Sequence, residues 1–217
     1  MKQSLFAVAH NRLLTRGLFA PDSTWLDIGP GEDVIALTAI GSALFGATKL
    51  GRLLCRFAML EEIPWADIGN IPSPLGLAAT NLTATPQRLV CLSQEVGDMR
   101  GLYARVPVLT ESGWERFDNA WGMDALTASS GRLFGFCSLV AGGRGIHAHD
   151  PVSRETGWYR IGDASDVRSL AGGEDKLHAL TKDGSIWARE PALLNTGWEL
   201  IGKLPDAVAL GVATCVG

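Results

Sequence analysis

The sequence predicts an all-β protein, a five-bladed β-propeller of four-stranded blades that forms one domain over residues 1–217. Three observations predict it. A tryptophan motif recurs five times, the same short apolar runs follow each copy, and the copies lie 40 to 49 residues apart, which is the period of a propeller blade. The motif tryptophans are Trp25, Trp65, Trp114, Trp158 and Trp198.

The motif itself is the first repeated element and reads W-x-x-I-G. It is intact at residues 25–29, 65–69, 158–162 and 198–202, and it is degraded at residues 114–118, where Phe117-Asp118 replaces Ile-Gly. Short apolar segments of this kind, bounded by turn residues, are typical of strands.

Three further apolar runs follow each motif and supply the remaining strands of a unit. The first run occupies residues 34–37, 74–77, 123–126, 167–170 and 207–210. The second occupies residues 44–47, 89–92, 133–136, 177–180 and, at the other end of the chain, 5–8. The third occupies residues 53–56, 102–105, 146–149, 186–189 and 13–16. Turn signals such as Asp183-Gly184 separate the runs.

The fifth unit is split between the two ends of the chain. Its motif and first run lie at residues 198–210, whereas its second and third runs lie at residues 5–16. We therefore expect the last blade to be closed by N- and C-terminal strands. On this interpretation the apolar N-terminus, cut short by His10-Asn11-Arg12, is a strand and not a leader, and a cytoplasmic location is expected.

Composition excludes several classes of protein. The formal net charge is −4 and the pI is about 5.6, so no nucleic-acid partner is expected. No apolar run reaches the roughly 20 residues that a membrane span needs. The four cysteines lie far apart without C-x-x-C or zinc-type spacing, so free thiols in a reducing compartment are the expectation. Their positions are Cys55, Cys91, Cys137 and Cys215.

The repeat also resembles a known family. The order W-x-x-I-G, apolar strand, L-F-x-x-T and L-x-A-R is similar to the tectonin or tachylectin-like β-propeller repeat, and five copies match the five-bladed tachylectin group from Leu5 to Val216. The resemblance implies a multivalent lectin with shallow glycan sites, often for N-acetylated amino sugars, and no cofactor. Because the copies are unequal, two or three competent sites, or none, are expected. A protein-interaction scaffold with a protein partner, and a structural module without a ligand, remain as alternatives.

The third run holds the candidate sugar-binding residues, because residues two apart on a strand share a face. An aromatic ring stacks on a sugar, and a guanidinium donates hydrogen bonds to its oxygens. The candidates are the pairs Tyr103–Arg105, His147–His149 and Trp187–Arg189, with Trp121 added because it is not repeated in the other blades. The five motif tryptophans are expected to be packing anchors between blades.

Alternatives to a ligand role stay open for the third run. Its arginines, at positions 16, 56, 105 and 189, would also fit ion pairs with Asp27 or Asp67 between blades. His147-x-His149 would suit a metal, but leucine, tyrosine, tryptophan and arginine fill the same columns in other copies, so no metal is expected. No nucleophile elbow, phosphate-binding loop or H-E-x-x-H motif is present, and no catalytic residue or enzyme activity is expected.

Overall fold

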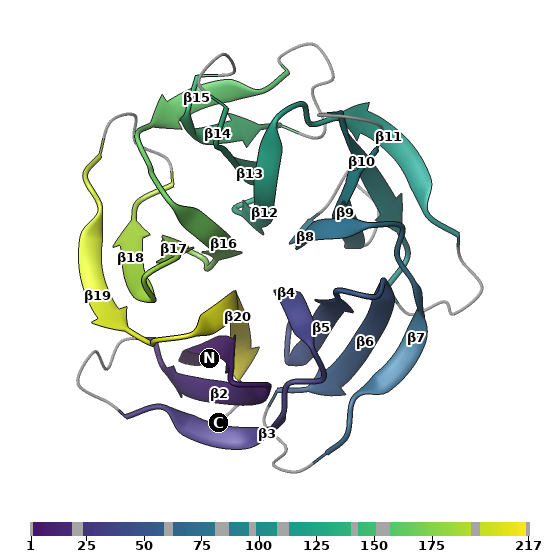
Figure 1. The fold of residues 1–217 in the computed structure, drawn as a ribbon, viewed down its shortest axis with the longest axis vertical. Helices are drawn as coiled ribbons and strands as arrows, with labels where there is room; N and C mark the ends of the chain where they lie inside the picture. The colour runs from purple at the N-terminus through teal and green to yellow at the C-terminus, as the bar shows by residue number, and fades with distance from the viewer. Residues whose placement is uncertain are drawn as a thin grey trace.

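A computed structural model shows the predicted five-bladed propeller (Figure 1). The structure describes residues 2–18, 24–58, 63–80, 87–95, 99–107, 113–139, 143–150, 157–191 and 196–215. The strands found in this part of the chain, β1 to β20, form five antiparallel four-stranded sheets arranged around one axis.

We name the blades A to E in chain order. Blade A contains β20 (Ala207–Cys215), β1 (Lys2–Ala9), β2 (Arg12–Gly17) and β3 (Leu26–Pro30), from the axis outwards. Blade B contains β4 (Val34–Ile40), β5 (Ala43–Thr48), β6 (Arg52–Phe57) and β7 (Ala66–Asn70). Blade C contains β8 (Pro74–Thr80), β9 (Arg88–Gln94), β10 (Arg100–Arg105) and β11 (Glu115–Asn119). Blade D contains β12 (Met123–Ser129), β13 (Arg132–Cys137), β14 (Gly145–His149) and β15 (Tyr159–Gly162). Blade E contains β16 (Val167–Gly172), β17 (Leu177–Thr181), β18 (Ser185–Arg189) and β19 (Glu199–Lys203).

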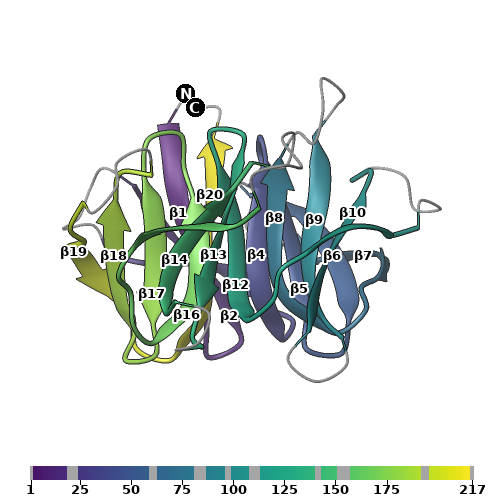
Figure 2. The same ribbon diagram turned by 90° about the horizontal axis from the view of Figure 1, so that it is seen from above.

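The closure of the ring by the chain ends is confirmed. Strand β1 pairs with β20 from Lys2↔Cys215 to Ala9↔Ala207, with a register shift after Val8. The two ends of the chain accordingly lie side by side at one end of the ring (Figure 2). Because β1 pairs with β20 on one side and with β2 on the other, the two chain ends form one continuous sheet and the ring has no open seam there.

One detail of the predicted division was wrong. Each tryptophan motif supplies the outermost strand of a blade. This strand is hydrogen-bonded to the third run, which precedes the motif in the sequence, and not to the first run, which follows it. The motif therefore completes one blade and does not begin the next. Strand β19 after Trp198 therefore belongs to blade E, and the C-terminus gives blade A only β20. The sequence repeat and the blade are out of phase by one strand.

The up-and-down course of every blade creates two different faces. The connections from one blade to the next, at residues 31–33, 71–73, 120–122, 163–166 and 204–206, all lie on the same face, which we call the crossover face. The hairpins between second and third strands lie on it as well and bond to these connections, as when Ile71 N–H donates to Gly51 O at 2.6 Å. The first and third strands of each blade run away from the crossover face and end at the opposite face.

The core is divided among the blade junctions. Five buried apolar clusters follow one another around the ring, and each combines residues from two neighbouring blades. Near the axis the innermost strands approach so closely that a Cβ on Gly211 would lie 3.0 Å from the Cβ of Leu37. Packing between blades is therefore tightest at the centre and leaves little freedom for the inner strands.

The structure bears on two features considered in the sequence, membrane-spanning segments and the cysteine thiols. No helix in the described ranges is long and apolar enough to cross a membrane. Cys55, Cys91 and Cys137 are free thiols, and burial raises the pKa of Cys91 far above its ordinary value, which makes that thiol unreactive.

His178 on β17 makes stability depend on pH. Its side chain is 2% exposed, and desolvation lowers its pKa from 6.5 to about 4. The unfolded chain takes up a proton near pH 6.5 while the folded protein resists protonation until about pH 4, so stability falls as pH decreases across this window. Phe6, Phe45 and Phe134 hold the same position in other blades.

We predict that His178→Phe removes this acid sensitivity. Between pH 7 and pH 4.5 the wild type should lose more unfolding free energy than the variant, by up to roughly 3 kcal/mol. Urea denaturation at both pH values measures the difference. Other acid-sensitive groups are common to both proteins and cancel. An equal loss in both proteins would show that His178 does not control the acid limb.

Candidate functional site

Each motif tryptophan is an anchor between two blades, as predicted. The five indoles are half-buried, and the N–H groups of four of them reach back to a backbone carbonyl at the end of the preceding blade's outer strand. The bonds are Trp65 to Pro30 O at 2.9 Å, Trp114 to Asn70 O at 2.7 Å, Trp158 to Asn119 O at 3.0 Å and Trp198 to Asp163 O at 3.0 Å. The indole thus satisfies a carbonyl that would otherwise be left at the junction.

A buried arginine from the third strand lies against four of these indoles. The guanidinium carbons of Arg16, Arg56, Arg105 and Arg189 lie 5.0 to 5.7 Å from the rings of Trp25, Trp65, Trp114 and Trp198. Each guanidinium also donates to a motif carbonyl of the preceding blade, as Arg56 does to Ile28 O at 3.1 Å. Desolvation lowers the pKa of these arginines, yet arginine keeps its charge even so.

The motif glycine makes room for the guanidinium. A Cβ on Gly202 would lie 2.7 Å from Nη1 of Arg16, and one on Gly69 would lie 3.1 Å from Nη1 of Arg105. Three residues that recur in the repeats therefore act together, because the indole, the guanidinium and the motif glycine meet at one blade junction. Asp27, one of the acids considered as a partner for these arginines, pairs with Arg12 at 2.7 Å.

The junction between blades C and D is built differently. His149 replaces the arginine, and Asp118 replaces the glycine. The imidazole Nε2 lies 2.9 Å from Asp118 Oδ2, and the ring centroid lies 5.1 Å from that of Trp158. The two substitutions fit each other, because the histidine side chain is shorter than arginine and leaves space for the aspartate side chain.

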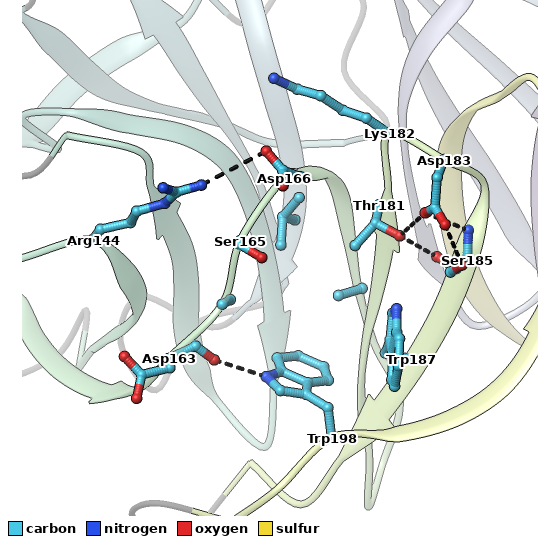
Figure 3. Close-up of a pocket in the computed structure, with 13 residues that line it drawn as sticks. Arg144, Asp163, Ser165, Asp166, Thr181, Lys182, Asp183, Ser185, Trp187 and Trp198 are labelled. Atoms are coloured by element: carbon cyan, nitrogen blue, oxygen red, sulfur yellow. Dashed lines mark hydrogen bonds and ion pairs between the residues drawn. The ribbon is translucent and has the colours of Figure 1, made fainter.

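The junction between blades D and E carries a pocket of about 770 Å³ on the crossover face (Figure 3). Trp187 and Trp198 form its aromatic wall, the connection 163–166 forms a second wall, and the hairpin between β17 and β18 forms a third. Trp187, one of the predicted ligand residues, is half-buried and lines this pocket.

The polar groups of the pocket are held in place by local bonds. Asp183 accepts hydrogen bonds from Thr181 Oγ1 at 2.6 Å and from Ser185 Oγ at 2.8 Å, and these bonds lower the pKa of Asp183 far below its ordinary value. Arg144 lies 3.6 Å from Asp166 across the mouth. Figure 3 shows these groups around the two indoles. The pocket therefore presents rings together with fixed acceptors and a cation.

The other predicted site residues lie elsewhere. Arg105, Arg189, His147 and His149 are between 1% and 5% exposed, so their side chains belong to the blade interior and meet no solvent in this conformation. Trp187 and Arg189 do share one face of β18, but Arg189 lies against Trp198 beneath the pocket. A sugar-binding role for these four side chains stays a prediction to which the geometry adds no support.

Tyr103 and Trp121 differ from this buried group. Tyr103 holds the position of Trp187 in blade C, where its hydroxyl donates to Glu95 Oε1 at 2.8 Å, and this bond raises the pKa of Tyr103. Arg116 pairs with the same carboxylate at 2.7 Å. Trp121 is 51% exposed on the crossover face, as expected of an unrepeated tryptophan.

A second cavity of about 250 Å³ surrounds the propeller axis toward the opposite face. Hydroxyl and amide groups and small residues line it, among them Thr38, Thr127, Ser129 and Gln3, with Glu174 as an acidic member. Its polar lining fits the inner edges of the blades, where backbone groups have no strand partner. Among the described residues no group of three or more His, Cys, Asp and Glu side chains is placed to hold a metal ion.

Sequence reasoning missed most of the pocket. Asp183-Gly184 was recognised only as a turn, and the connection 163–166 was not singled out. The one available signal was the unrepeated Trp187 in a column that otherwise holds Leu14, Leu54, Tyr103 and His147.

Comparison with known proteins supports the fold and goes no further. No family model matches the chain, and no curated protein matches it. A structure of a protein of unknown function from Bacteroides thetaiotaomicron is similar with a TM-score of 0.51 and 9% identity, over 92% of this chain and 64% of that one. The N-terminal domain of Nup159 (TM-score 0.41, 15% identity, 77% and 43% coverage) and YCF48 bound to D1 peptide (0.43, 15%, 92% and 67%) are more distant. The chain thus spans about half to two thirds of these structures.

We predict that Arg189→Met destabilises the protein, because it removes a buried cation from an indole and leaves the Ile161 carbonyl unpaired. The expected loss is about 2–4 kcal/mol of unfolding free energy, measured by urea denaturation. Trp187→Ala, on the same face of the same strand, serves as the control and should lose less than Arg189→Met. An Arg189 variant of wild-type stability would contradict the structural role.

Proposed function

We propose that this propeller binds carbohydrate and that the pocket between blades D and E is its site. The observation that carries the proposal is the position of Trp187, an unrepeated and half-buried tryptophan in the wall of that pocket. An aromatic residue that the repeat does not require, placed where a ligand would meet its face, is explained by ligand contact.

The chemistry of the remaining wall supports a sugar. Indole faces take up the apolar C–H side of a pyranose ring, while fixed acceptors and a cation meet its hydroxyl groups. Asp183, Asp166 and Lys182 surround the rings with both signs of charge, so a neutral ligand fits better than a strongly charged one. The volume of about 770 Å³ lies in the range of small-molecule sites. N-acetylated amino sugars are the first class to test, on the basis of the family resemblance.

Binding to a glycan array and calorimetric titration with the best sugar test this proposal. We predict that Trp187→Ala weakens binding about five- to twelvefold, since a lost ring contact is worth about 1–1.5 kcal/mol and 1.4 kcal/mol is tenfold. Trp187→Phe should retain part of the affinity. Trp121→Ala removes an exposed tryptophan outside the pocket and should bind like the wild type.

The outcomes separate three cases. Binding lost with Trp187 supports the proposal and its site. Binding that survives in Trp187→Ala supports a lectin but moves the site to another blade. A blank array, repeated at high protein concentration, would overturn carbohydrate binding.

A second candidate function, a protein-interaction scaffold, is favoured by a separate observation. Leu50, Met99 and Trp121 are 88%, 52% and 51% exposed, and topology places all three on the crossover face of blades B and C. Exposed apolar side chains on one face are typical of partner surfaces. A purified partner whose affinity falls in Trp121→Ser but not in Trp187→Ala would favour this function over the first.

A further inference from the structure

The cavity on the propeller axis is bounded by the innermost strands of all five blades. These strands pack directly against one another, since β20 lies against β4 and β8 lies against β12. A Cβ on Gly172 would overlap the carbonyl oxygen of Ala128, so β16 and β12 meet backbone to backbone. Toward the opposite face the same strands leave a space of about 250 Å³, which shares no lining residue with the pocket between blades D and E.

Small side chains at one repeated position make this space. The second residue after the first apolar run is alanine in three blades, glycine in one and valine in the last, and all five line the cavity. They are Ala39, Ala79, Ala128, Gly172 and Val212. The three alanines are half-buried although they lie in the innermost strands, because they border the cavity and not a neighbouring side chain.

Hydroxyl groups border these small residues at the positions directly before and after them. The residues are Thr38, Thr80, Thr127 and Ser129, which all line the cavity and are 3% to 8% exposed. No lysine, arginine or histidine is found among the described residues of the wall, and its carboxylate, Glu174, is exposed. A bare cation would therefore lack a buried counter-charge, and an uncompensated buried charge is costly. The wall favours a neutral ligand that carries hydroxyl groups.

Thr80 lacks the hydrogen bond that its counterpart in the next blade makes. Ser129 holds the same position in blade D and donates from Oγ to Gly173 O of blade E at 2.7 Å. Thr80 is 3% exposed, yet its Oγ1 has no hydrogen-bond partner in the part of the chain that the structure describes. A buried hydroxyl without a partner is unfavourable, so an oxygen of a ligand in the cavity would satisfy it.

We propose that the axial cavity is a second binding site, for a small neutral polyol, and that Thr80 bonds to this ligand. A polyol hydroxyl both donates and accepts, which suits a wall of hydroxyl groups and strand-edge backbone groups. The cavity volume equals that of about eight water molecules in the liquid, which suits a short open-chain polyol such as erythritol or xylitol. The ligand contacts the inner strands of several blades and thereby stabilises the assembled ring.

Methyl NMR of the full chain, with threonine and alanine methyl groups labelled, tests the site directly. Erythritol and xylitol are titrated separately to high millimolar concentration. We expect saturable shifts of the methyl groups of Thr38, Thr80 and Thr127 with at least one of them. The methyl group of Thr15 is the internal control, because Thr15 bonds to Leu5 O at 3.2 Å outside the cavity and reports the general effect of the cosolvent.

Three variants locate the binding. Thr80→Val keeps the shape of the side chain and removes its hydroxyl, so the affinity should fall about two- to twelvefold. Without polyol this variant should be at least as stable as the wild type in urea, because the hydroxyl it removes has no protein partner among the described residues. Ala79→Val narrows the cavity with the residue that Val212 places at this position in blade A, and it should abolish binding. Trp187→Ala changes the separate pocket and should bind polyol like the wild type.

The outcomes are distinct. Saturable shifts that need a higher polyol concentration in Thr80→Val support the proposal. Shifts that only follow that of Thr15, or none, would mean that water alone fills the cavity and would overturn it. Saturable shifts with calcium chloride but with neither polyol would overturn the neutral class of ligand. The methyl groups observed lie outside the pocket between blades D and E, so failure here is distinguishable from failure of the carbohydrate site.

Discussion

An arginine packed against a tryptophan at four blade junctions, with a histidine in its place at the fifth, is the contact on which the ring depends. A propeller blade makes all its hydrogen-bonded pairings internally, so neighbouring blades adhere through side chains. The indole and the cation bridge that gap, since each binds a carbonyl of the preceding blade, as Trp65 and Arg56 bind Pro30 and Ile28. Buried charge is costly unless it is compensated, and here the ring face and the carbonyl each offset part of that cost.

This contact explains why the repeat has the form it has. The motif glycine is required by the guanidinium that lies against it, and this arginine comes three strands later, in the following blade. The junction between blades C and D has other residues at the same two positions. Where the glycine became Asp118, the facing arginine became His149, and the two side chains bond to each other. The two differing residues thus form one contact at the place in the ring where glycine and arginine meet in other junctions.

The fold could be predicted from the sequence because a fivefold repeat averages out local ambiguity. Any one apolar run would be hard to assign, but five copies in the same order indicate one repeated sheet. The strand phase could not be predicted in the same way, since a cyclic pattern has no marked beginning. The strand after Trp198 belongs to blade E because it is hydrogen-bonded to β18. The sequence spacing would be the same if that strand belonged to blade A.

The candidate site was predictable only in part, for a geometric reason. Alternation correctly places Trp187 and Arg189 on one face of β18, but it says nothing of depth along the strand. Trp187 lies near the crossover face and lines the pocket, whereas Arg189 lies two residues further on, under Trp198. The polar wall comes from turns of two blades, and turn signals predict the path of the backbone without showing where its side chains meet.

Trp198 belongs both to the junction between blades D and E and to the wall of the pocket. Its N–H anchors blade E to blade D, while its ring forms part of the pocket wall. Its replacement would loosen the junction and damage the pocket in the same step, so a change at Trp198 could not alter binding without altering stability. Trp187 carries no such junction bond. Substitutions at Trp187 and at the turns around it can therefore change the shape of the pocket while the anchor at Trp198 is kept. A ligand seated between the two blades would also stabilise the ring, because it binds only when that junction is formed.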